Sequence, residues 1–200
     1  MGKCLIPDDR AVTQASTDNR AAADRRGAVS LWHDPGIRFA LVGALLFGTL
    51  SWLVRVESPV PMIGRFVRGV TEVQAAVAAG LLNLFGQPVV RRGVFLDGAG
   101  FVCEVGEGCN GVVALNLAAA AVLAWPVSWR RRLAGLAWML PAVLAINIVR
   151  IAALWWVGRH RPDWFDLAHV YVGQVVVIVG TVAAWGIWLS WNEPRRPASS

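Results

Sequence analysis

The class of fold is decided by one stretch of the chain, LAGLAWMLPAVLAINIVRIAALWWV, which runs from Leu133 to Val157. A transmembrane helix needs about 20 consecutive, mostly apolar residues. This stretch is longer than that and holds a single charge, Arg150. Three other stretches are of the same kind: Ile37 to Val56, Asn110 to Trp129, and Val170 to Trp191. We therefore predict about four transmembrane helices.

The composition also indicates a membrane protein. Hydrophobic residues make up 56% of the chain and charged residues only 16%, whereas soluble domains carry about 25% charged residues. Eleven tryptophans stand against one tyrosine, and indole rings favour the membrane interface. The formal net charge is +6, with arginines in short clusters beside apolar runs. Such clusters fit topology signals and anionic headgroups, so we expect the lipid bilayer, and no nucleic acid, as a partner.

The arginine clusters predict the orientation. They are Arg20, Arg25 and Arg26; Arg130, Arg131 and Arg132; and Arg195 and Arg196. With four spans all three clusters lie on one side, which the positive-inside rule makes the cytoplasm. We predict a disordered cytoplasmic tail at 1–36, a membrane-embedded domain at 37–191 and a cytoplasmic C-terminal tail at 192–200. Segments 57–108 and 158–168 would then face outward, in a multi-pass protein of the cytoplasmic (inner) membrane.

One outer segment, residues 59–88, has apolar residues at helical spacing. They are Val70, Val73, Val77, Leu81 and Leu84. This pattern favours an amphipathic helix that lies on the outer surface or dips partly into it. The alternative is a fifth full span, which would put the N-terminal arginine cluster on the side opposite to the other two clusters. The runs 94–96 and 101–105 then read as a hairpin with Asp97-Gly98 at its turn. The predicted fold is an all-α polytopic membrane protein with about four transmembrane helices, an outer amphipathic helix and a short β-hairpin.

Three chemically reactive side chains meet in this topology. Cys109 directly precedes the second span and His169 the fourth, both at the outer edge. Arg150 lies inside the third span, seven residues before Val157, which is about 10 Å below the outer end. We therefore expect all three in the outer half of the membrane, supplied by three different helices.

Each of these residues also has a plainer interpretation. A charge within a span usually marks a functional site, but Arg150 could instead snorkel to the headgroups. Asn147 lies one turn earlier on the same face and could simply bond a neighbouring helix. Cys109 could be an inert small hydrophobe or pair with Cys103 in a disulfide. His169 could be an ordinary interfacial histidine.

Together, a cysteine, a histidine and an arginine suit acyl transfer. A helix N-terminus and a nearby arginine both favour a thiolate, so we expect the thiolate form of Cys109 to be stabilised. A thiolate attacks a peptide carbonyl and forms a thioacyl intermediate. An imidazole such as that of His169 can move the proton of the leaving amine. The guanidinium of Arg150 can stabilise the developing oxyanion.

The motifs around these residues resemble those of exosortases and archaeosortases. Cys109-Asn110-Gly111 looks like the Cys-x-Gly motif of that family, and Asn147-Ile148-Val149-Arg150-Ile151 looks like its Asn-x-x-Arg-Ile motif. His169 follows at the expected place, at the opening of the last helix. The resemblance covers roughly residues 40–190. Asn110 departs from the serine that many members carry, and the small number of spans suggests a compact subfamily.

The resemblance implies a membrane cysteine endopeptidase or transpeptidase without a cofactor or metal. Its substrates would be exported proteins that end in a sorting tail, made of a short motif, a transmembrane helix and a basic cluster. Cleavage would take place at the outer face of the cytoplasmic membrane. The implied catalytic residues are Cys109, Arg150 and His169, and the supporting residues are Asn147, Asn110 and Gly111.

Two other functions stay open. The chain could be a non-catalytic membrane assembly factor in which Arg150 and His169 only bridge helices. Alternatively, His160, His169 and Cys109 could bind a metal or haem, although their spacing matches no familiar zinc pattern. Reaction of Cys109 with an impermeant thiol reagent from outside, and loss of activity in Cys109→Ala, would favour the peptidase.

Overall fold

The computed structural model describes residues 34–54, 61–106 and 109–192. The predicted tails at 1–36 and 192–200 fall almost wholly outside these ranges. Helices predominate in the described chain, beside one small sheet. Within the ranges just given, three helical runs are long and apolar enough to cross a membrane: Pro35–Leu53 (α2), Trp129–His160 (α5) and Pro162–Asn192. The predicted all-α polytopic membrane fold is therefore confirmed.

The second predicted span is shorter than expected. Helix α4 covers Val112–Ala124, only 13 residues, or about 20 Å, whereas the hydrocarbon core is about 30 Å thick. The helix ends because Trp125 is extended, at φ −66° and ψ 135°, as the residue before a proline prefers. The prediction of a full span over 110–129 was wrong, and the apolar run includes a turn around Pro126.

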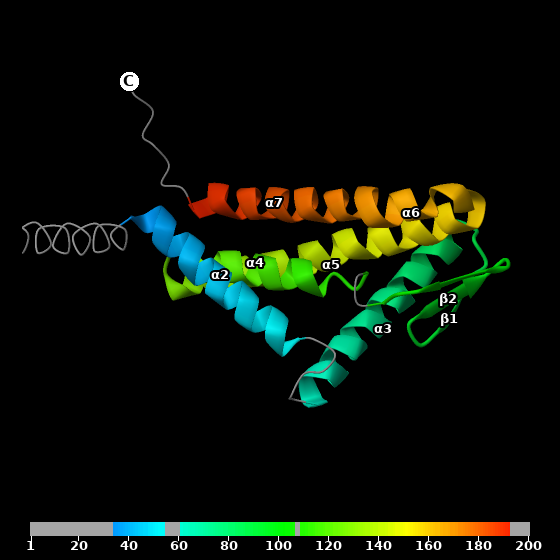
Figure 1. The fold of residues 1–200 in the computed structure, drawn as a ribbon, viewed down its shortest axis with the longest axis horizontal. Helices are drawn as coiled ribbons and strands as arrows, with labels where there is room; N and C mark the ends of the chain where they lie inside the picture. The colour runs from blue at the N-terminus through cyan, green and yellow to red at the C-terminus, as the bar shows by residue number, and fades with distance from the viewer. Residues whose placement is uncertain (1–33, 55–60, 107–108, 193–200) are drawn as a thin grey trace, which may run out of the picture. The chain divides into compact units, whose positions relative to one another are not determined.

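Helix α5 is the central element of the unit that begins at Gly43. It contacts α3 (Pro61–Leu84), α4 and α7 (Gly173–Asn192), and Figure 1 shows α7 running beside it. One apolar core joins α4, α5 and α7. Its buried members are Ala118, Val122, Met139, Val143, Ala184 and Trp188. This core fixes the helices that carry the candidate site.

Helix α3 uses a different face from the apolar one predicted. Its buried residues are Thr71, Gln74, Ala75, Ala78, Ala79 and Leu82, and mostly small side chains allow a close approach to α5. Of the apolar residues at helical spacing, Leu81 packs against the buried core that includes Ala75 and Ala78, but Val73, Val77 and Leu84 are exposed. They are available to lipid, as a helix lying at the membrane surface requires. Whether α3 lies on the outer surface stays a prediction.

The sheet has three antiparallel strands rather than a single hairpin. Strands β1 (Val90–Arg92), β2 (Phe95–Gly98) and β3 (Phe101–Glu104) pair in the order β1-β2-β3. Asp97 and Gly98 belong to β2, and the turn falls on Ala99 and Gly100, whose φ angles are 51° and 82°. Two positive φ angles are typical of a type I′ turn. The predicted turn was thus two residues early, and β1 was missed.

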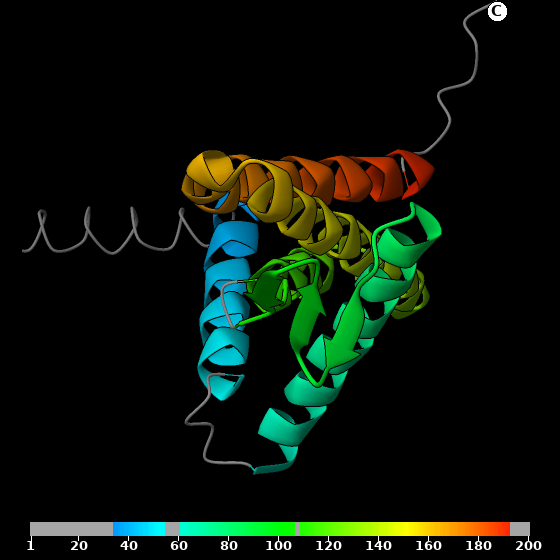
Figure 2. The same cartoon turned by 90° about the vertical axis from the view of Figure 1, so that its right-hand side faces the viewer.

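The sheet covers one end of α3 and α5, as Figure 2 shows for α3. Leu96 and Val105 are buried in a core with Ala75, Ala78 and Trp155. Cys103 packs against this core together with Phe101. The sheet therefore holds the segment that leads into Cys109.

Candidate active site

Cys109 and His169 are in direct contact. The Cys109 Sγ atom lies 3.3 Å from His169 Nδ1 and 3.8 Å from Nε2. Both distances permit a hydrogen bond to sulfur. Cys109 sits in a turn before α4, where its backbone N–H donates to Gly106 O over 2.9 Å. Cys109 is only 8% exposed, and its thiol and that of Cys103 are both free, so the disulfide alternative does not apply.

His169 projects from an unusual piece of helix. The segment Ala168–Val172 is a π-helical turn between α6 (Phe165–Leu167) and α7. A π turn carries one extra residue, which redirects side chains, and such turns are frequent at functional sites. The imidazole stacks on the Phe165 ring, with centroids 5.7 Å apart and planes 11° apart. The ring is therefore held in one orientation beside the sulfur.

Asn147 holds the backbone of the turn formed by Cys109, Asn110 and Gly111, which we call the cysteine turn. It is fully buried on α5, and its Nδ2 donates to Cys109 O and to Gln74 Oε1, both over 2.8 Å. Gln74, buried on α3, in turn donates from Nε2 to Asn110 O over 2.9 Å. Gln74 was not predicted from the sequence. The available signal was a lone amide beside Ala75 and Ala78 on a face of small residues.

Gly111 permits the close approach of this turn to α5. Its φ is 69°, in the left-handed region that favours glycine. A Cβ atom at this position would lie 2.9 Å from Asn147 Cγ, so a side chain would displace the amide. Asn110 Oδ1 accepts a hydrogen bond from Val112 N over 3.1 Å and thereby caps the start of α4. Both residues shape the turn that carries Cys109.

Arg150 lies inside the helix bundle and not at its surface. It is 5% exposed, so it does not snorkel toward headgroups. Its NH1 donates to Asn147 Oδ1 over 3.5 Å. A Cβ atom on Gly173 would lie 2.7 Å from Arg150 Nε, so the glycine gives the guanidinium its space.

The ionisation of Cys109 differs from the thiolate expected from its surroundings. Burial raises the pKa of the thiol, and the positive charge of Arg150 lowers it by less, so the net shift is upward. Desolvation penalises the charged form of a buried thiol. The resting residue is therefore a protonated thiol at neutral pH, and it needs a base. His169 occupies the position from which a base would act.

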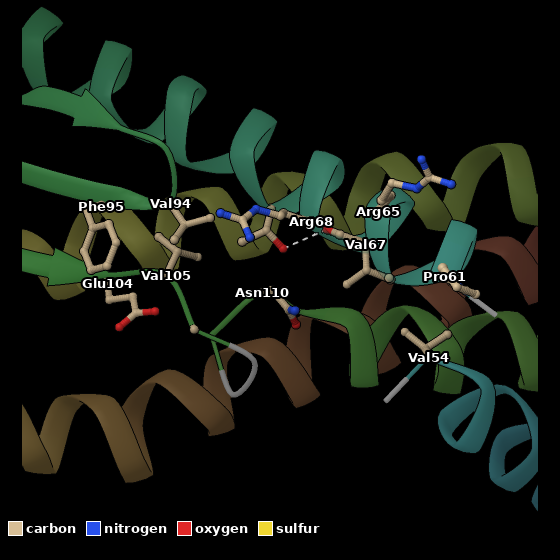
Figure 3. Close-up of a pocket in the computed structure, with 13 residues that line it drawn as sticks. Val54, Pro61, Arg65, Val67, Arg68, Val94, Phe95, Glu104, Val105 and Asn110 are labelled. Carbon is tan, nitrogen blue, oxygen red and sulfur yellow. Dashed lines mark hydrogen bonds between the residues drawn. The ribbon is translucent and has the colours of Figure 1, made fainter. Parts of the chain in front are cut away.

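A pocket of about 650 Å³ opens next to this turn. Its lining comes from α3, the sheet and the cysteine turn, and Figure 3 shows Asn110 between the side chains of Val105 and Val67. Arg65, Arg68 and Glu104 supply the charged part of the lining. The pocket reaches Asn110, the residue that follows Cys109.

The three ligands of the metal alternative, His160, His169 and Cys109, do not all lie together. His160 contacts Trp156, with Nδ1 2.9 Å from the Trp156 carbonyl oxygen and the two rings stacked. Among the residues with described positions, no group of three His, Cys, Asp or Glu side chains is placed to hold a metal ion. His160 is therefore not part of the cluster around Cys109 and His169.

Comparison with known families places the chain. The family described as transmembrane exosortase matches residues 31–186. The chain belongs to the transmembrane exosortase family. The matched region of this exosortase contains the cysteine turn, Asn147 and Arg150 on α5, and the π turn with His169. Neither the curated proteins nor the solved structures give a match to the chain.

Proposed function

We propose that this exosortase is a cysteine endopeptidase or transpeptidase that cleaves the C-terminal sorting tail of exported proteins through a thioacyl intermediate. The observation that carries the proposal is the contact of 3.3 Å between Cys109 Sγ and His169 Nδ1, with the buried Arg150 close enough to influence the thiol electrostatically. A nucleophile, a base and a fixed positive charge are the groups that acyl transfer needs. Family membership supports the same activity.

The first half of the reaction forms the acyl-enzyme. His169 accepts the thiol proton as the Cys109 sulfur attacks the carbonyl carbon of the scissile peptide bond. The carbonyl oxygen becomes an oxyanion, which the guanidinium of Arg150 stabilises. The intermediate then collapses, the carbon–nitrogen bond breaks, and the leaving amine takes the proton from His169. The product is a thioester on Cys109 and a released tail.

The second half regenerates the thiol. Water or an amine attacks the thioester while His169 accepts its proton, and the carbon–sulfur bond breaks. The departing sulfur recovers the proton from His169. Water as the acceptor yields a cleaved protein with a free carboxylate, and an amine yields a protein joined to a new anchor through an amide bond.

The substrate segment is proposed to lie in the pocket beside Asn110. This pocket borders the cysteine turn and is lined by the sheet and α3, which were both predicted to face outward. The sorting tail would supply a peptide segment for the pocket and a transmembrane helix for the surrounding bilayer. On this proposal the reaction takes place at the outer face of the cytoplasmic membrane, where exported proteins arrive.

The thioester itself provides the test. Membranes that contain the full-length enzyme and its tail-bearing substrates are quenched with acid during turnover, and the peptide carrying Cys109 is analysed by mass spectrometry. We expect a substrate fragment linked to Cys109 that neutral hydroxylamine releases. A matched sample of His169→Ala should carry far less of it. Steady cleavage with an unmodified Cys109 and a fragment on another residue would contradict the proposal.

A further inference from the structure

The acyl-transfer steps use Cys109, His169 and Arg150 but leave a buried glutamine on α3 unexplained. Gln74 is 1% exposed and lies among Ala75 and Ala78 on the face that packs against α5. A buried amide that lacks hydrogen bonds destabilises a protein. An apolar residue would avoid this requirement. The amide of Gln74 is instead engaged with the cysteine turn.

Two side-chain amides hold two consecutive backbone carbonyls of that turn. Asn147 donates to Cys109 O over 2.8 Å, and Gln74 donates to Asn110 O over 2.9 Å. The two amides are themselves linked, because Asn147 Nδ2 also donates to Gln74 Oε1. The turn is thus tied to α3 and α5 through its carbonyl oxygens.

This arrangement determines where the backbone N–H groups point. In a trans peptide the N–H lies on the side opposite the preceding carbonyl oxygen, and no cis bonds occur in the described chain. The carbonyls of Cys109 and Asn110 face α5 and α3, so the N–H groups of Asn110 and Gly111 face away from those helices. Both N–H groups belong to the residues that directly follow the nucleophile.

We propose that Gln74 is a positioning residue for acyl transfer: with Asn147 it turns the Asn110 and Gly111 N–H groups toward the bound carbonyl oxygen, where they assist Arg150 in stabilising the oxyanion. The inference rests on the proposed function. It differs from a general packing role because the glutamine acts through one hydrogen bond from Nε2 to Asn110 O. Removal of that bond frees the second peptide group while Asn147 still holds the first.

The test compares cleavage with thiol alkylation in native membranes. Gln74→Met keeps the length of the side chain and removes both hydrogen bonds. We expect it to lower the cleavage rate per folded enzyme by roughly 10²-fold, the scale for loss of one oxyanion donor. Alkylation of Cys109 by iodoacetamide forms no oxyanion, so its rate should stay within about threefold. Leu82→Ala is the control, because it weakens the same helix face without touching the turn.

Gln74→Glu supplies a second, pH-dependent measurement. Its carboxylate can still accept from Asn147 but cannot donate to Asn110 O, whereas the protonated acid can. Cleavage relative to the wild type, measured at each pH, should therefore rise as the pH falls. This variant also decides the case if Gln74→Met fails to accumulate.

The outcomes separate the two proposals. The inference is overturned if Gln74→Met cleaves within about twofold of the wild type, or if its cleavage and alkylation fall together as in a structural defect. It is likewise overturned if the cleavage rate of Gln74→Glu, divided by that of the wild type at the same pH, does not change with pH. Failure of the proposed function would look different, since Cys109→Ala would then cleave as fast as the wild type.

Discussion

Gly173 on α7 faces Arg150 on α5 so closely that a Cβ atom on the glycine would lie 2.7 Å from the arginine Nε. The same Cβ would lie 3.0 Å from the Ala168 carbonyl oxygen, in the π turn that carries His169. Because Gly173 has no Cβ atom, both the Arg150 guanidinium and the π turn that carries His169 have room beside it. The spacing of α7 from α5 at Gly173 therefore bears on both Arg150 and the turn that carries His169.

This contact predicts the effect of the smallest possible substitution. Gly173→Ala should favour helix formation by about 0.5–1 kcal/mol yet displace Arg150, so we expect cleavage to fall at least about tenfold. Gly186→Ala is the matched control, since Gly186 lies in the same helix and an added methyl group there would meet nothing within 4 Å. Cleavage is measured per enzyme molecule in native membranes. Equal activity of the two variants would rule out the spacing role of Gly173.

Replacement of Arg150 separates charge from shape. Lysine keeps the charge but loses the planar five-donor fork, so Arg150→Lys should insert normally and lose roughly 10²–10³-fold in cleavage rate. Arg150→Leu should lose at least as much. If the arginine only braces helices, both variants would cleave nearly as well as the wild type. The amount of inserted protein, measured by immunoblot, corrects both rates.

The raised pKa of Cys109 predicts a pH dependence for alkylation. A thiol reacts as its thiolate, and burial raises the pKa of Cys109 against the opposing charge of Arg150. Reaction with iodoacetamide should therefore be slow at neutral pH. It should accelerate as the pH rises past the usual pKa range of cysteine thiols. Removal of the opposing charge in Arg150→Leu should move the curve to still higher pH. A shift to lower pH in that variant would contradict the electrostatic role of the arginine.

The sequence predicted much of this site because its reactive residues stand out against apolar surroundings. Arg150 is the single charge in a long apolar run, and Cys109 and His169 each precede such a run. Gln74 gave no comparable signal, since an amide on an amphipathic helix is usually solvated. Its burial depends on which face of α3 meets α5, and the larger apolar residues of that helix pointed to the opposite face. Helical periodicity also could not show the π turn at His169.

The direction in which the pKa of Cys109 shifts could not be predicted from the sequence, for a related reason. A helix start and an arginine argue for a thiolate, and both are read from neighbours along the chain. Burial depends on contacts among α3, α5 and the sheet, and it has the larger effect on the pKa.

The length of α4 was also not predicted correctly. The apolar run continues past Trp125, but the helix ends there because Trp125 is extended and a proline follows it.

The pocket beside Asn110 predicts where a bulky residue blocks the reaction. A tryptophan at Gly64 would project from the lining of the pocket, where a new side chain meets nothing within 4 Å. Gly64→Trp should therefore reduce cleavage at least about tenfold by occupying the space of the substrate, with Cys109 alkylation unchanged. Gly80→Trp lies on the same helix, also in open space, and should cleave normally. Equal rates in both variants would exclude this pocket as the peptide site.

The central claim is that Cys109 is the nucleophile, and Cys103 offers a matched control from the same chain. Burial, the nearby Cys109 and Glu104 raise the pKa of Cys103 to about 11, so this second thiol is a poor nucleophile. The direct measurement is the amount of uncleaved tail-bearing protein in cells that express Cys109→Ala or Cys103→Ala at equal levels. We expect complete accumulation with Cys109→Ala and normal cleavage with Cys103→Ala. Normal cleavage in cells with Cys109→Ala would contradict the account.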